Sequence, residues 1–121
     1  MPSKRRRIRD RLTETDEDRL AAEVREWADG LSGTVRIAEA PVRARVRLAG
    51  AVRRISIRPV KGFDALGVLF SDGTGEVAVE WLGRRTIPGL TLGSRLVLEG
   101  VLGLDGGMLR MVNPTFEFVT A

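Results

Sequence analysis

Five short stretches of alternating apolar and polar residues, separated by turns that contain glycine or proline, occupy residues 41–119 of this 121-residue chain. Alternation with a period of two places the apolar side chains on one side of a strand. The pattern predicts strands at 41–59, 66–70, 76–82, 95–104 and 108–119. Asp72 and Gly73 lie between two of these runs and are typical of a tight hairpin turn. Short strands at this spacing favour a small, mainly β barrel.

The first predicted strand changes phase along its length. Val46 and Leu48 lie on one side of it, whereas Ile55 and Ile57 fall on the opposite parity. Because Gly50 lies between the two halves, we expect a bulge and a sharp bend near this glycine. A bent strand can then serve two faces of a barrel.

The N-terminal third carries two blocks of opposite charge. Residues 1–14 hold six basic and two acidic residues, and we expect a flexible basic arm. Residues 15–30 hold two basic and six acidic residues, and predict a helix capped by Thr15 and ended by Gly30. The arm is expected either to tether polyanions or to dock on this acidic helix. The expected division is therefore an arm at 1–14, a helix and linker at 15–34, and a barrel at 35–121.

A single apolar stripe follows the predicted helix. Leu20, Val24, Trp27 and Leu31 recur at helical spacing. We expect this stripe to be buried as the helix caps the open end of the barrel. The alternative is that it forms a surface for a dimer or another protein.

The composition excludes several kinds of site chemistry. The chain has no cysteine, histidine or tyrosine, so Ser–His and Cys–His nucleophile pairs and thiolate metal sites are impossible. We expect no enzymatic activity, no cofactor and no metal. The lack of cysteine fits a reducing cytoplasm, and no apolar run is long enough to span a membrane. A net charge of +4 is typical of a protein that binds polyanions.

Three sequence segments carry a resemblance to a known family. "LFSDGTGEVAVEWL", "PGLTLGSRLVLEGVL" and "GGMLRMVNPTFEF" resemble the OB-fold family typified by anticodon-binding domains and by the wedge domain of the bacterial helicase RecG. The whole chain also resembles small stand-alone OB-fold proteins of actinobacteria. The resemblance covers residues 43–119 and implies a five-stranded Greek-key barrel. It also implies non-enzymatic binding of single-stranded or structured DNA or RNA.

The first predicted strand supplies most of the candidate phosphate-binding residues. Arg43, Arg45 and Arg47 share one face, and Arg53 and Arg54 follow the bend. Arginines at every second position form a stripe that matches a phosphate backbone. The alternative is a solvated face balanced by acids on neighbouring strands, such as Glu99 or Glu117.

Nucleic acid in an OB-fold usually lies across strands 2 and 3, between the loops that join strands 1–2 and 4–5. The predicted strand 1–2 loop, 58–64, supplies Arg58 and Lys61 for phosphates and Phe63 for stacking on a base. The alternative is a solvated loop in which the Phe63 ring folds back onto the barrel. Arg84 and Arg85, after the third strand, either extend the basic patch or form a charged turn.

The third predicted strand presents a difficulty for this interpretation. Trp81 shares parity with Val77 and Val79, which favours a core position over a stacking platform. The opposite face then carries Glu76 and Glu80, and acidic side chains repel phosphate. The sequence leaves open a ligand on another face, or a protein partner bound by helix 16–29 or by this acidic face. We expect a monomer that binds single-stranded DNA or RNA with little sequence preference.

Overall fold

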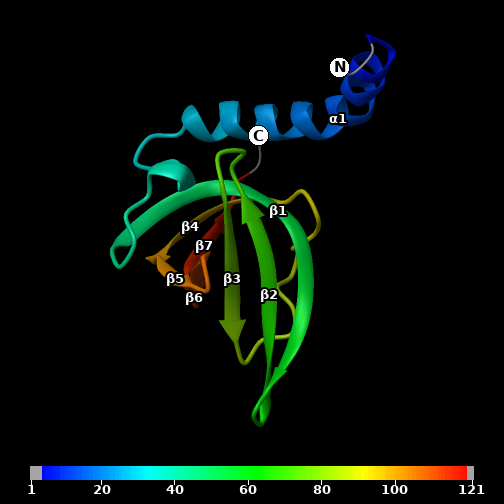
Figure 1. The fold of residues 1–121 in the computed structure, drawn as a ribbon. Coiled ribbons are helices and arrows are strands. Elements are labelled where there is room, and N and C mark those ends of the chain that lie inside the picture. Colours follow the sequence, from blue (N-terminus) through cyan, green and yellow to red (C-terminus); the bar gives the residue numbers. More distant parts are fainter. Residues whose placement is uncertain (1–3, 120–121) are drawn as a thin grey trace.

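The computed structural model describes the backbone of residues 4–119 and the side chains of residues 16–119. A long helix precedes a short 3-10 turn and seven strands (Figure 1). The elements are α1 (Lys4–Asp29), η1 (Ile37–Glu39), β1 (Arg45–Val60), β2 (Phe63–Ser71), β3 (Glu76–Leu82), β4 (Arg95–Val101), β5 (Gly103–Asp105), β6 (Met108–Val112) and β7 (Thr115–Phe118). Within this described part of the chain, no helix combines the length and the apolar character needed to cross a membrane.

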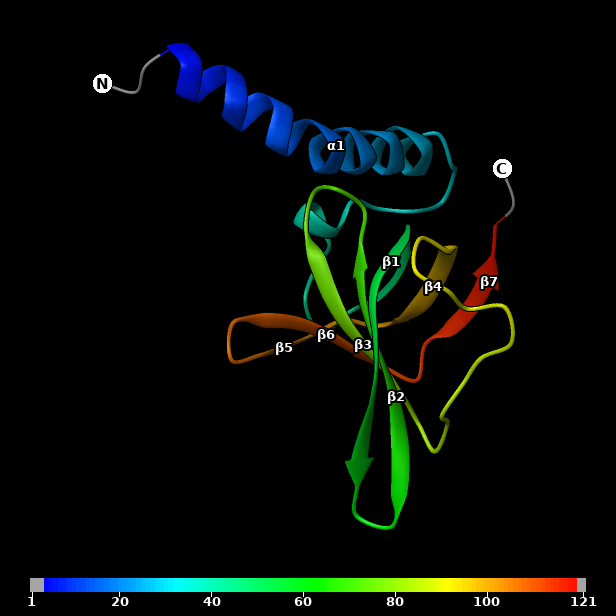
Figure 2. The same cartoon turned by 90° about the vertical axis from the view of Figure 1, so that its right-hand side faces the viewer.

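The strands form one curled sheet in the order β5-β6-β3-β2-β1-β4-β7. The pairing is antiparallel except between β3 and β6, which run parallel. β6 and β7 are consecutive in the chain, yet β6 pairs with β3 and β7 pairs with β4 at the other end of the sheet. The last segment therefore spans the gap between the two ends of the sheet (Figure 2), and the barrel is OB-like without being closed by hydrogen bonds.

β1 bends as its sequence predicts. Its first half pairs with β4 and its second half with β2. The register with β2 shifts between Val52 and Arg54, so the predicted bulge is confirmed a few residues after Gly50. Gly50 is required at the bend because a Cβ there would lie 2.6 Å from the carbonyl oxygen of Ser71.

Two predicted features of the strands are wrong. Residues 58–64 are not an open loop: β1 and β2 continue to a turn at Lys61 and Gly62, and this hairpin projects from the barrel (Figure 1). The last predicted strand is divided because Asn113 takes a positive φ of 53° and Pro114, which follows it, has no N–H to donate to a ladder. Asn113 is held in place by its side-chain oxygen, which accepts the N–H of Leu82 at 2.9 Å.

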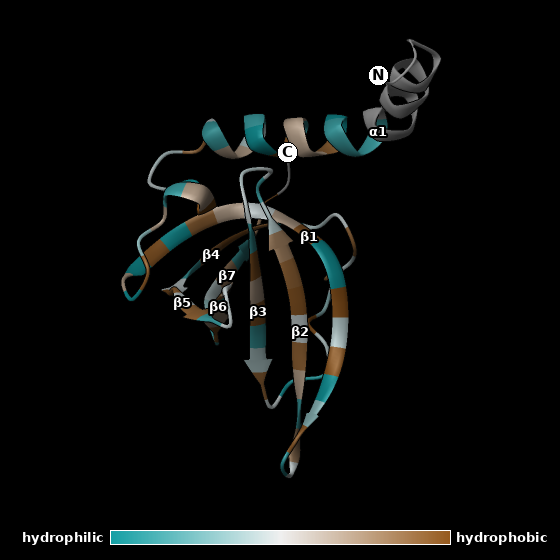
Figure 3. Cartoon of the chain, in the orientation of Figure 1, coloured by the Kyte–Doolittle hydropathy of each residue, from teal (hydrophilic) through white to brown (hydrophobic). Residues whose placement is uncertain are grey.

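The barrel core consists of the inward side chains of these strands. Phe70, Leu48 and Leu66 are among the largest fully buried side chains. Trp81 is 4% exposed, and its Nε1–H donates to the carbonyl of Pro114 at 3.0 Å. The inward parity predicted for Trp81 is therefore confirmed. Figure 3 shows that β2 is apolar over most of its length.

The helix differs from the expectation at its start. It begins at Lys4, so the predicted cap at Thr15 is wrong, and the backbone of 4–14, expected as a flexible arm, is helical. The physical reason is that no glycine or proline occurs between Ser3 and Asp29, and arginine and leucine favour helices. Residues 1–3 lie outside the described residues. The predicted end before Gly30 is confirmed.

The helix does not bury its whole apolar stripe. Ala28 packs against Ala49 and Val97, which lie on the outer surface of β1 and β4, with Trp27 and Leu31 beside them. Leu20, in contrast, is 61% exposed, so its predicted burial is wrong. The helix rests on the outside of the sheet through its C-terminal half, and its N-terminal half extends past the barrel (Figure 2).

The β2–β3 hairpin connects the barrel to the linker and the helix. Asp72 is buried and accepts the N–H groups of Ile37 and Thr74, both at 2.8 Å, together with the hydroxyl of Thr74 at 2.6 Å. Gly73 has a φ of 86°, and a Cβ there would lie 2.5 Å from the carbonyl oxygen of Ala21 in the helix. The DGTG segment therefore has a structural role.

Candidate nucleic-acid interface

The arginines at the start of β1 do not form the predicted free stripe. Arg45 pairs with Glu99 at 3.0 Å. Arg47 lies 3.9 Å from Glu99 and 3.7 Å from Glu117. Arg43 precedes β1 in a turn, with a φ of 65°, so it is not part of the strand. The alternative of arginines balanced by acids on neighbouring strands is therefore the arrangement found here.

The second half of β1 belongs to a different outer surface. Residues opposite each other in neighbouring strands share a face, so the registers of β1, β2, β3 and β6 define three rows across it. These rows are Arg54–Leu69–Ala78–Arg110, Ser56–Gly67–Glu80–Val112 and Arg58–Ala65–Leu82. We call this surface the β2–β3 face. Arg54 and Arg58 lie on its β1 edge and Arg110 on its β6 edge, and the residues between them are small or apolar except for Glu80.

Glu80 lies in the middle of the β2–β3 face and is neutralised there. Arg58 donates to its Oε2 from Nη2 at 2.6 Å and from Nε at 3.2 Å. Arg110 donates to its Oε1 from the other edge of the face. To reach Glu80 on β3, the Arg58 side chain passes over β2, the strand that lies between β1 and β3. With a side chain only 12% exposed, Glu80 presents little negative charge to a ligand.

Arg110 also contacts an acid at the rim of the face. Its Nη1 lies 3.2 Å from Asp105, at the β5–β6 turn. Glu76, the other acid predicted on this surface, is exposed at the start of β3, beside the structural DGTG turn. Of the two acids expected on the outer face of β3, only Glu76, at the start of the strand, is exposed and lies away from the centre of the face.

The tip of the β1–β2 hairpin continues the face outward. Val60 pairs with Phe63, and the Phe63 ring is 44% exposed. Lys61 is exposed in the turn between them. Among the side chains of residues 16–119, no carboxylate lies within 4.0 Å of the charged groups of Arg54 or Lys61. These two cations and one exposed aromatic ring are accessible to a ligand.

The structure brings together four of the predicted residues and separates the others. Arg54, Arg58, Lys61 and Phe63 lie on the β2–β3 face or at its hairpin tip. The part of β1 that pairs with β4 contains Arg45 and Arg47, and Arg43 lies just before it. Arg53 lies in the bulge, near α1, and Trp81 lies in the core. Trp81 therefore offers no ring face to a base.

Arg84 and Arg85 occupy the loop after β3. Arg85 pairs with Asp64 at 3.3 Å. The guanidinium of Arg84 lies 5.9 Å from the centroid of the Phe116 ring, which in turn meets the Trp81 ring edge-on at 5.5 Å. These contacts favour the interpretation of a charged turn over an extended phosphate-binding patch.

Sequence reasoning missed several residues of the face, three of them on β3 and β6. Arg110 and Val112 lie outward on β6, and Leu82 lies outward at the end of β3. The signal was available, because burial of Met111 leaves its neighbours Arg110 and Val112 on the opposite side. Within residues 16–119, no three carboxylates gather closely enough to hold a metal ion.

Comparisons with known proteins identify the fold. No protein-family model and no curated protein sequence matches the chain. Among solved structures, the OB domain of Ta0387 from Thermoplasma acidophilum superimposes with a TM-score of 0.59 at 13% identity, covering 73% of this chain and 88% of its own. The replication factor A related protein from Methanobacterium thermoautotrophicum gives a TM-score of 0.57 at 19% identity, covering 71% and 90%.

A third similar structure is that of a replication protein A heterotrimer bound to single-stranded DNA. It gives a TM-score of 0.53 at 14% identity and covers 78% of this chain and 71% of its own. At these identities the likeness shows the fold alone. The protein is thus a mainly β, OB-fold protein with an N-terminal helix.

Proposed function

We propose that this protein binds single-stranded nucleic acid across the β2–β3 face, without catalysing a reaction. The observation that carries the proposal is the neutralisation of Glu80 by Arg58 and Arg110. This pairing removes the charge that would repel phosphates from the centre of the face. Arg54 and Lys61 then remain as cations for phosphate contacts, with Phe63 close to Lys61 at the hairpin tip for stacking.

The arrangement of the face explains how a strand would bind. β1 and β6 are separated by three strand spacings, about 14 Å, so the two arginine edges flank a shallow apolar floor. Leu69, Leu82 and Ala78 on this floor offer apolar contact to bases without donors or acceptors that read their edges. We therefore expect little sequence preference, and an affinity that comes mainly from phosphates.

The structural comparisons support the proposal. One of the similar structures is described as bound to single-stranded DNA, and OB-folds commonly bind oligonucleotides on the same strands. From the sequence we also propose that the chain is related to anticodon-binding and RecG wedge domains and that it is cytoplasmic. The proposed ligand is single-stranded DNA or RNA.

A titration of labelled single-stranded DNA and RNA oligonucleotides, followed by fluorescence anisotropy over a series of salt concentrations, tests the proposal. For the native chain we expect a log–log salt slope that corresponds to about three or more phosphate contacts. Two double variants form a matched pair: Arg54→Gln with Lys61→Gln, and Arg45→Gln with Arg47→Gln. The first pair should reduce the number of contacts by about two, and the second should leave it unchanged.

Either of two results would overturn the proposal. One is the absence of binding by the native chain even at low salt. The other is a larger loss from the Arg45 and Arg47 pair than from the Arg54 and Lys61 pair, which would place the ligand on the β4 side of the barrel.

A further inference from the structure

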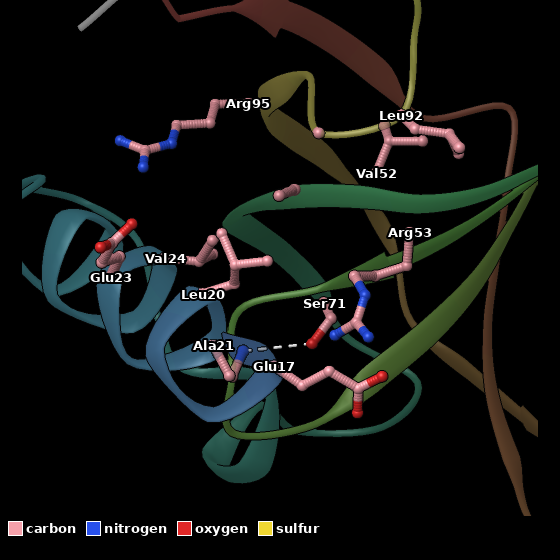
Figure 4. Close-up of a pocket in the computed structure, with 13 residues that line it drawn as sticks. Glu17, Leu20, Ala21, Glu23, Val24, Val52, Arg53, Ser71, Leu92 and Arg95 are labelled. Atoms are coloured by element: carbon pink, nitrogen blue, oxygen red, sulfur yellow. Dashed lines mark hydrogen bonds between the residues drawn. The ribbon is translucent and has the colours of Figure 1, made fainter. Parts of the chain in front are cut away.

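A cleft lies between the middle of α1 and the barrel. It has a volume of about 290 Å³ and is lined on the helix side by Leu20 and Val24 and on the barrel side by Val52 and Leu92 (Figure 4). Leu20 is 61% exposed and Leu92 is 66% exposed. Two large aliphatic side chains thus face solvent at the mouth of one cleft, which is typical of a surface that contacts another chain.

The helix that forms one wall of this cleft has two halves of opposite charge. Residues 4–14 hold six basic and two acidic residues, and residues 16–29 hold two basic and six acidic residues. The acidic half includes Glu17 and Glu23, which both line the cleft. Each half carries a net charge of magnitude four, with opposite sign, so each is the natural electrostatic partner of the other.

The two halves cannot meet within one chain. They belong to a single continuous helix, Lys4–Asp29. Their centres are about 13 residues apart, which corresponds to about 20 Å along the axis of a helix. The self-docking of the basic segment considered from the sequence is therefore excluded by the helix itself. Only a second molecule can bring a basic half against an acidic half.

We propose that two copies of this chain associate through α1, side by side and antiparallel, with the basic half of each helix entering the cleft of the other copy. If the two antiparallel helices cross at residue 15 of each copy, backbone position 6 of one copy lies opposite Val24 of the other. Position 9 then lies opposite Ala21 of the other copy. Positions 6 and 9 precede Leu20 by about four and three helical turns, so they lie on the same face of the helix as Leu20. Both positions carry arginine.

The charges around the cleft define where the partner's basic segment lies. Glu17 and Glu23 are on the helix wall, whereas Arg53 and Arg95 are on the barrel wall. The Arg95 guanidinium is already placed over the Trp27 ring, at 5.0 Å from its centroid. The partner's basic segment therefore lies against the helix wall, close to Glu17 and Glu23 and away from the two arginines of the barrel wall.

The oligomeric state of the full chain tests this inference. In sedimentation equilibrium at low salt, we expect a species of twice the 13.3 kDa chain mass, and a weaker association as salt is added. Leu20→Ser should shift the dissociation midpoint by at least about tenfold in concentration. The matched control is Leu104→Ser, on β5, which removes a leucine of similar exposure, 59%, and should change nothing.

A pair of charge-reversed chains provides the sharper test. In one variant Arg5, Arg6 and Arg9 become Glu, and in the other Asp16, Glu17 and Glu23 become Lys. Each variant alone should associate at least about tenfold more weakly than the native chain, because like charges then face each other. An equimolar mixture should form a heterodimer, since every contact between halves again joins opposite charges. Circular dichroism checks that each variant keeps its helix.

Three outcomes would overturn the inference. A native chain that is monomeric at every concentration lacks the interface. If reversal of Arg5, Arg6 and Arg9 then weakens only oligonucleotide binding, the basic half contacts nucleic acid and not a second copy. A dimer that survives in both variants uses another surface. A mixture that fails to associate shows that the charges of the two halves do not direct the pairing.

Discussion

Asp72 shows how a single buried carboxylate connects the parts of this molecule. It accepts hydrogen bonds from the N–H groups of Ile37 in the linker and Thr74 in its own turn. We expect Asp72→Ala to lower the free energy of unfolding by roughly 2–4 kcal/mol, because both N–H groups lose their acceptor. Urea denaturation measures this change. Glu76→Ala, an exposed acid in the same hairpin, is the control and should change stability by less than about 0.5 kcal/mol.

Phe63 and Trp81 are two aromatic residues with different roles. Phe63 is 44% exposed at the hairpin tip, whereas Trp81 is part of the core. We expect Phe63→Ala to weaken oligonucleotide binding by about 1–3 kcal/mol through the loss of one stacked base. The unfolding free energy of the Phe63→Ala variant should be nearly the same as that of the native chain. The measurement is fluorescence anisotropy at fixed salt.

Phe118→Ala is the matched control for this prediction. Phe118 is 42% exposed but lies on β7, away from the β2–β3 face. Its removal should leave oligonucleotide affinity unchanged. Equal losses from the two variants would show that Phe63 is not a specific contact.

At the scale of the element, the course of β1 was predictable but its partners were not. Alternation identified the inward Val46 and Leu48, and the phase change near Gly50 indicated the bend. The acid that neutralises Arg45 and Arg47 is 54 and 52 residues away, on a strand whose register no local pattern defines. Pairing between strands therefore decides which arginines are free, and the sequence alone could not decide it.

The last predicted strand illustrates a second limit. The alternation in 108–119 correctly indicated extended structure, but the prediction of one continuous strand ran through Asn113-Pro114, where the structure divides it. That the two parts pair with different strands depends on the curl of the whole sheet. The same pairing brings Arg110 next to Glu80, so this part of the candidate site could only be found in the structure.

The linker after α1 gives a prediction about pH. Arg36 donates two hydrogen bonds to Asp29, at 3.0 and 2.7 Å, and this bonding holds the pKa of the Asp29 carboxyl below its usual value of 3.8. A lowered pKa in the folded state means that the ion pair stabilises the fold above pH 3.8 and that this contribution is lost as the pH falls through the folded-state pKa.

The comparison of the native chain with Asp29→Asn tests this pH dependence. The difference in unfolding free energy between them should be constant near neutral pH and shrink in acid. In an Arg36→Gln background the same substitution should show a much weaker pH dependence. A difference that grows in acid would contradict the assignment, and denaturant titrations at several pH values measure it.

At the scale of the whole molecule, the curled sheet separates charged surfaces with different roles. The arginines on the β4 side are engaged by Glu99 and Glu117. The β2–β3 face is flanked by arginines and continued by an exposed hairpin tip. The helix rests on a third surface, where Ala28 packs against Ala49 and Val97. Fold and candidate site are thus linked, because the bend in β1 directs one strand to two of these surfaces.

The most direct test of the central claim is a map of backbone amide chemical-shift changes as a single-stranded oligonucleotide is added to the labelled protein. We predict the largest changes in the second half of β1, the Lys61–Gly62 turn, β2, β3 and β6. The amides of β4 and β7 around Glu99 and Glu117 should change little. Changes centred on Arg45, Arg47 and Glu99, or none on the β2–β3 face, would contradict the proposed binding surface.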